Sequence, residues 1–69
     1  MNEDDLDRFL AVYVEQRSRL ATRELMATVD ELVELGLQHG ATENAVRTSI
    51  ECLCVRGAVV CDGPYVIAA

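Results

Sequence analysis

Apolar side chains near the N-terminus recur every three or four residues, at Leu6, Phe9, Leu10, Tyr13 and Val14. This period places them on one side of an α-helix that continues to Gln16. Carboxylates crowd its first turn, where they complement the positive end of the helix dipole, and Asn2 or Asp4 can cap it. The polar run 17–19 predicts a break after this helix.

A second helical stripe follows, formed by Leu25, Val29, Leu32, Val33 and Gly36. The opposite face carries the acidic residues, which are Glu24, Asp30, Glu31 and Glu34. Thr22 is a suitable N-cap, and we expect the helix to end near Gln38. Gly40 then supplies the left-handed residue that commonly follows a helix end.

The third predicted helix spans residues 42–56, with Thr42 as its N-cap and Gly57 as its stop. Its apolar positions predict a buried side made of Val46, Ile50, Leu53 and Cys54. The remaining positions, which point outward, are Glu43, Asn44, Arg47, Thr48 and Glu51.

Two β-prone runs close the chain and surround an Asp-Gly turn signal, which predicts a hairpin over residues 58–68. Asp62-Gly63 alone favours a two-residue turn. Because Pro64 has no N–H to return to Cys61, we expect a wider loop that pairs Val60 with Tyr65.

Three helices followed by a hairpin, with a glycine-containing turn between the second and third, is the element order of a winged helix-turn-helix. We therefore predict one mainly α domain over residues 1–69 with a C-terminal β-hairpin. In such a domain the third helix can enter a DNA major groove while the hairpin, or wing, lies against the neighbouring backbone.

The run Gly40-Ala41-Thr42-Glu43-Asn44-Ala45-Val46-Arg47-Thr48-Ser49-Ile50, followed by Leu53 and Gly57, resembles the turn and recognition helix of winged-helix bacterial regulators. The resemblance is closest to the repressors of phenylacetic acid degradation operons and covers residues 40–57. It implies a DNA-binding transcription regulator. Cys52 and Glu51 depart from it, since those regulators tend to carry a basic residue just before the Leu. The resemblance does not reach the effector-sensing region of that family, so ligand sensing is not carried over.

Charge weighs against DNA, since the 69 residues hold 12 acids and six arginines, without lysine, for a net charge of −6. The charge is unevenly spread: residues 16–23 carry three arginines and no acid, whereas residues 1–15 and 24–46 are acidic. Arg17, Arg19, Arg23 and Arg47 could form one modest basic patch, or be four separate solvated arginines.

On the DNA reading, Thr42, Asn44 and Thr48 contact base edges or phosphates, and Arg47 contacts a phosphate or a guanine. Each also has an ordinary structural explanation, because Thr42 is a helix cap and the others are exposed helix residues. Tyr65 either touches DNA from the wing or packs against the third helix.

The alternative is a small acidic winged-helix protein that binds a basic protein surface through Asp4, Asp7, Asp30, Glu31 and Glu34. Phage or mobile-element inhibitors of host nucleic-acid machinery, including anti-CRISPR proteins, share this size and charge. Either reading is compatible with a homodimer, formed through exposed apolar residues such as Val12, Leu20, Leu35 or Leu37.

The three cysteines, Cys52, Cys54 and Cys61, are interpreted as buried or half-buried small hydrophobes in a reduced, cytoplasmic protein. Their spacing, with His39 distant, does not fit a zinc site. No nucleophile–base spacing or glycine-rich phosphate loop indicates catalysis, so we expect neither an enzyme nor a cofactor. No apolar run approaches the length of a membrane span, which predicts a soluble protein.

Overall fold

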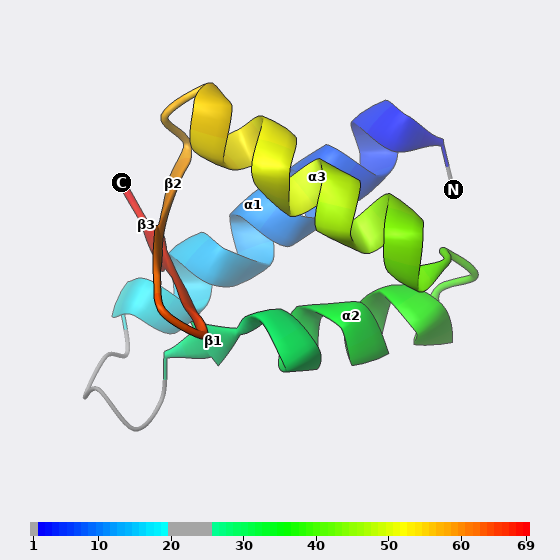
Figure 1. Cartoon of the computed structure of the whole chain (residues 1–69), viewed down its shortest axis with the longest axis horizontal. Coiled ribbons are helices and arrows are strands. Elements are labelled where there is room, and N and C mark those ends of the chain that lie inside the picture. The colour runs from blue at the N-terminus through cyan, green and yellow to red at the C-terminus, as the bar shows by residue number, and fades with distance from the viewer. Residues whose placement is uncertain (1, 20–25) are drawn as a thin grey trace.

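The computed structural model describes residues 2–19 and 26–69. Its elements follow in the order α1 (Glu3–Arg19), β1 (Ala27–Thr28), α2 (Val29–Gln38), α3 (Glu43–Val55), β2 (Val59–Asp62) and β3 (Tyr65–Ala68). The chain is therefore mainly helical with a C-terminal antiparallel hairpin, in a winged-helix-like arrangement, as the sequence predicts. Figure 1 shows the hairpin beside the C-terminal ends of α1 and α3 and the start of α2.

One core joins the helices to the sheet, because each contributes the apolar side of its pattern. Within residues 2–19 and 26–69, the buried hydrophobic residues of this core are Leu6, Leu10, Val14, Ala27, Leu32, Val33, Val46, Ile50, Leu53, Val59 and Val66. Ser49, on the buried side of α3, is also enclosed. Cys54 is exposed instead, so its predicted place on that side was wrong.

The predicted break after α1 was also wrong, since Arg17 and Arg19 lie within the helix. Tertiary contacts hold this last turn. The Ser18 hydroxyl accepts a hydrogen bond from the backbone N–H of Ala68 at 3.0 Å, and Arg17 forms an ion pair with Glu31 on α2 at 2.9 Å.

The second helix begins later than predicted. Thr28 is its N-cap, and its hydroxyl accepts a hydrogen bond from the N–H of Glu31 at 3.1 Å. Residues 27 and 28 form strand β1 because they pair with β3, where Ala27 lies opposite Val66. The predicted cap Thr22 lies outside the described residues.

The turn between α2 and α3 is tight and contains a glycine in the left-handed region just past the helix end, as predicted, since Gly40 has φ +87°. The Ala41 N–H donates to the Gly36 carbonyl at 2.8 Å and closes the end of α2. Gly36 itself faces α3, where a Cβ at this position would lie 2.2 Å from Val46 Cγ2. A glycine is therefore what allows the two helices to approach so closely.

The three-stranded sheet has the order β1-β3-β2 with antiparallel pairing throughout. Asp62 pairs with Tyr65 and Val60 with Ile67, so the predicted pairing of Val60 with Tyr65 was wrong. The turn has two residues, and Gly63 takes a positive φ of +59° ahead of Pro64, the signs expected for a type II′ turn. Pro64 is accommodated because it sits in the turn, where its missing N–H removes no bond from the ladder.

Candidate nucleic-acid interface

The outward face of α3 presents an uninterrupted row of polar side chains. Asn44, Arg47, Thr48 and Glu51 are all exposed, as predicted, because Val46, Ile50 and Leu53 turn the opposite face into the core. The spacing of three and four residues keeps the row on one side of the helix. This is the surface that a winged helix-turn-helix offers to a major groove.

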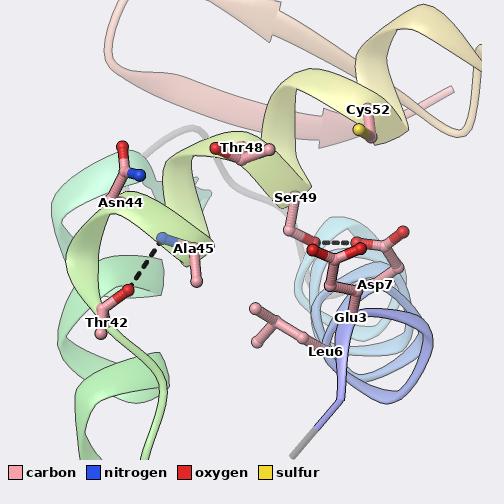
Figure 2. A pocket seen from close by; sticks show the side chains of 9 residues that line it. All are labelled: Glu3, Leu6, Asp7, Thr42, Asn44, Ala45, Thr48, Ser49 and Cys52. Atoms are coloured by element: carbon pink, nitrogen blue, oxygen red, sulfur yellow. Dashed lines mark hydrogen bonds between the residues drawn. The ribbon is translucent and has the colours of Figure 1, made fainter.

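Thr42 caps α3 as predicted, since its hydroxyl oxygen accepts a hydrogen bond from the Ala45 N–H at 3.1 Å (Figure 2). The residue is also exposed. A threonine hydroxyl that accepts one bond retains its own proton as a donor. Capping and contact with a phosphate or base are therefore compatible at this position.

On one side, the polar row borders a groove between α3 and the start of α1. Figure 2 shows its lining, in which Asn44, Thr48 and Cys52 come from α3 and Glu3 and Asp7 come from α1. Leu6 of α1 also lines the groove, and the two polar residues that α1 contributes are both carboxylates. A phosphate on this side would meet negative charge, so the groove disfavours the DNA backbone.

Asp7 is committed to the fold and is not part of an open acidic surface. Its Oδ1 accepts a hydrogen bond from the Ser49 hydroxyl, and its Oδ2 lies 3.4 Å from Arg56 Nη1. Its side chain keeps only 18% of its exposure. The sequence signal was present, because Ser49 falls at the buried spacing between Val46 and Leu53 and a buried hydroxyl needs a partner.

The opposite side of α3 faces the hairpin across a second groove, lined by Val29, Arg47, Ile50, Glu51, Cys54 and Cys61. Arg47 is the cation of this face. Its Nε lies 3.0 Å from Glu43 Oε2 one helical turn earlier, and the two side chains are 52% and 61% exposed. This ion pair is open to water, so the arginine can exchange its partner at little free-energy cost.

The predicted basic patch is largely neutralised by carboxylates. Arg17 lies 2.9 Å from Glu31, and Arg19 Nη2 lies 2.8 Å from Glu15 Oε1. Arg23 lies outside the described residues. Of the four arginines in the predicted patch, Arg47 is the one that lies on α3. The tertiary pairing of Arg17 with Glu31 could not be predicted from the sequence.

Arg17 and Glu31 belong to a half-buried cluster completed by Tyr13. The Tyr13 hydroxyl donates a hydrogen bond to Glu31 and accepts one from Arg17 Nη1 at 2.9 Å, while the guanidinium lies 5.7 Å from the ring centroid. Partial burial raises the pKa of Tyr13, and the Glu31 carboxylate raises it further although Arg17 opposes this. Glu31 therefore serves to join α2 to α1, a use that the surface interpretation missed.

The acidic residues predicted to bind protein thus divide into two groups. Asp7 and Glu31 are tied into the structure, which corrects their assignment to an open surface. Asp4, Asp30 and Glu34 are exposed and form no ion pair with any residue of the described ranges.

Among the apolar residues predicted to be exposed, Val12 and Leu37 are about half exposed, at 47% and 52%, whereas Leu35 packs against the core. Leu20 lies outside the described residues.

All three cysteines are free and exposed, contrary to the expectation that they would be buried or half-buried. Across residues 2–19 and 26–69 no group of three or more His, Cys, Asp or Glu side chains could hold a metal ion. His39 packs its ring against Phe9, with centroids 4.8 Å apart. In the same ranges, no helix combines the length and apolar character needed to span a bilayer.

Comparison with protein-family models, with curated proteins and with solved structures found no match for this chain.

Proposed function

We propose that the protein is a non-enzymatic regulator that binds double-stranded DNA, with residues 42–56 as the recognition helix and residues 58–68 as the wing. The observation that supports this most is the polar row on α3, which is exposed along its length and adjoins the hairpin. In this arrangement one helix face is available for a major groove about 12 Å wide, while the hairpin can reach the flanking backbone.

In the proposed complex Asn44 and Thr48 face base edges, and Arg47 takes a phosphate or a guanine. Arg47 has to leave Glu43, which the exposure of that pair permits. Thr42 donates its hydroxyl proton to a phosphate near the start of α3. Because the exposed Glu3 carboxylate lies on the α1 side, the backbone approaches from the hairpin side, where Arg47 lies.

The acidic charge of the domain limits how tightly one copy can hold DNA. With few cations on the proposed face, the logarithm of the affinity should fall with that of salt by about 0.9 for each phosphate neutralised. A homodimer would double the number of contacts and so reach a tighter complex. A reduced, cytoplasmic location fits this function.

The test measures fluorescence anisotropy of labelled random and genomic duplexes at several salt concentrations, beginning at about 50 mM. Arg47→Ala should weaken binding about 5- to 150-fold and flatten the salt dependence by about one phosphate. Arg8→Ala is the matched control, since Arg8 is also exposed but lies on α1 outside the polar row. Absence of binding by the unaltered protein, or an equal loss in both variants, contradicts the proposal.

A second function is favoured by the way charge is distributed. Four arginines of the described ranges form ion pairs, whereas Asp4, Asp30 and Glu34 remain exposed without one. A protein with a basic, nucleic-acid-binding surface would meet these carboxylates favourably. On this proposal the chain is an inhibitor of the kind that phages and mobile elements direct at host nucleic-acid machinery.

The corresponding test is capture of a partner from nuclease-treated extract, followed by salt-dependent binding to the purified partner. The double substitution Asp30→Asn, Glu34→Gln should slow association mainly at low salt, because rim charges act on the rate of encounter. Glu15→Gln is the control, since Glu15 already pairs with Arg19. Failure to capture a stoichiometric partner, or an unchanged association rate, counts against this function.

A further inference from the structure

Two of the three cysteines lie together in the groove between α3 and the hairpin. Cys54 comes from the last turns of α3 and Cys61 from β2, and both line this groove beside Arg47 and Glu51. Cys52 instead lines the groove on the α1 side. Because residues two apart on a helix differ by about 200° in direction, Cys52 and Cys54 occupy opposite flanks of α3.

The backbone between Cys54 and Cys61 brings these two residues to the same groove. Gly57, with φ +78°, ends α3, and the Ala58 N–H donates to the Leu53 carbonyl at 2.9 Å, which turns the chain directly into β2. In β2, Val59 is buried, and Cys61 two residues later shares its face, because side chains alternate along a strand. Cys61 therefore points to the side of the hairpin on which α3 lies.

The Cys54 thiol also acts on the thiol of Cys61. Partial removal of its thiol from water raises the pKa of Cys61, and the neighbouring Cys54 raises it further through a hydrogen bond and through charge. Cys61 thus retains its proton beside Cys54. A thiol whose pKa is raised reacts less readily as the first nucleophile, which leaves it the second step of disulfide formation, the attack on an oxidised neighbour.

We propose that Cys54 and Cys61 are a reversible thiol–disulfide modification site, oxidised by hydroperoxides, that links the C-terminal part of α3 to the hairpin. Both residues are accessible, since each is exposed. The inference goes beyond the proposed DNA binding and does not depend on what α3 binds.

The reaction balances with hydrogen peroxide as the oxidant. The Cys54 thiolate attacks one peroxide oxygen, the O–O bond breaks, and Cys54 becomes a sulfenic acid while hydroxide leaves and is protonated to water. The Cys61 sulfur then attacks the Cys54 sulfur, the S–O bond breaks, and a second water leaves as the disulfide forms. Two thiols and one peroxide give one disulfide and two waters. A small dithiol returns the pair to the reduced state by exchange.

The chain offers a direct readout of which sulfurs are joined. Trypsin cleaves after Arg47 and Arg56, which places Cys52 and Cys54 in peptide 48–56 and Cys61 in peptide 57–69. A Cys54–Cys61 bond therefore links the two peptides, whereas a Cys52–Cys54 bond stays within one. The variant Cys52→Ser removes the remaining ambiguity and is the matched control, because Cys52 is exposed on the other flank of α3.

The experiment treats the folded chain with stoichiometric hydrogen peroxide, blocks remaining thiols and analyses the intact mass and the tryptic peptides. Oxidation should remove about 2 Da, the mass of two hydrogens, from both the unaltered protein and Cys52→Ser, and both should give the linked peptide pair. The unaltered protein should in addition carry one blocking group, on Cys52, and Cys52→Ser none. Cys54→Ser and Cys61→Ser should lose the link, and Cys61→Ser should instead give a dimedone adduct at Cys54. Circular dichroism checks that each variant is folded.

A second measurement remains decisive if a serine variant fails to fold. In concentrated urea the unaltered chain should distribute its disulfides among all three cysteines, whereas the folded chain should join only Cys54 and Cys61. A folded chain that forms only the Cys52–Cys54 bond, only links between molecules, or no disulfide overturns the proposal. The proposal is also overturned if the linked peptide pair of Cys52→Ser forms no faster in the folded protein than in urea.

Discussion

The contact between Gly36 and Val46 sets how closely α2 approaches α3. It leads to the prediction that the effect of Gly36→Ala on the free energy of unfolding depends on whether residue 46 is valine or alanine. In the unaltered protein a Cβ at residue 36 would lie 2.2 Å from Val46 Cγ2. Carbon atoms normally approach to about 3.5–4.0 Å, and Val46 is fully buried, so the valine has little room to move. Forcing a methyl group into such a core costs about 1–3 kcal/mol.

The gain in helix propensity from glycine to alanine, about 1 kcal/mol, offsets part of this cost. We therefore expect Gly36→Ala to lower the free energy of unfolding by up to about 2 kcal/mol. Val46→Ala removes two buried methyl groups, each worth about 0.8 kcal/mol, and leaves a cavity, for a loss of about 2–3 kcal/mol.

In the Val46→Ala background the clash disappears. The next atoms around a Cβ at residue 36 are Val46 Cβ at 3.5 Å and Ala41 Cβ at 3.7 Å, both at ordinary contact distance. Gly36→Ala should then raise the free energy of unfolding by about 1 kcal/mol, since only the propensity gain and some cavity filling remain. The coupling energy between the two sites is thus about 1–3 kcal/mol.

Urea unfolding followed by circular dichroism measures all four members of this cycle, with an osmolyte added if the single variants are too unstable. A chain of 69 residues has about 3–10 kcal/mol in total, so differences of this size are readily measured. Gln38→Ala, exposed on the same helix, is the control and should act alike in both backgrounds. If Gly36→Ala destabilises both backgrounds equally, within about 0.5 kcal/mol, the explanation by close approach is refuted.

Three further predictions concern polar contacts of the fold. Asp7→Ala should destabilise by about 1–3 kcal/mol and more than Ser49→Ala, because it leaves the buried Ser49 hydroxyl without its acceptor; chemical denaturation of both variants decides, and the reverse order contradicts the assignment. Thr28→Ala should cost about 1 kcal/mol through loss of the α2 cap, whereas Thr28→Ser should retain most of the stability; equal losses would show that capping is not the cause. Because the pKa of Tyr13 is raised in the folded state, the free energy of unfolding should fall as the pH rises above about 10. Tyr13→Phe should show a smaller fall between about pH 9 and 11. If the unaltered protein and the variant lose stability with the same slope, Tyr13 is not the cause.

The parts of the fold that the sequence predicted best are the helices whose apolar residues recur at regular spacing. The stripe on α1 and the capped, glycine-ended α3 required only local signals, and the structure places Thr42, Gly40 and Gly57 in the predicted roles. Strand β1 could not be found in this way. Ala27 and Thr28 have no strand pattern of their own and become a strand only because β3 offers them a partner.

The same limit applies to the candidate interface. Exposure of Asn44, Arg47 and Thr48 followed from helix geometry alone. The pairing of Arg17 with Glu31 did not, since these residues lie 14 positions apart and meet only when α1 packs beside α2. A count of charges along the chain therefore overstated the positive surface that the fold leaves open.

The central position of β3 gives the hairpin a different character from a free-standing wing. Strand β3 is paired on both sides, by β1 and β2, and the Val29 N–H donates to the Pro64 carbonyl at 3.0 Å, which fastens the turn to the start of α2. Backbone amides of β3 should consequently exchange with solvent only when the helical core also opens. A force on the tip of the hairpin is therefore passed through this hydrogen bond to the first turn of α2.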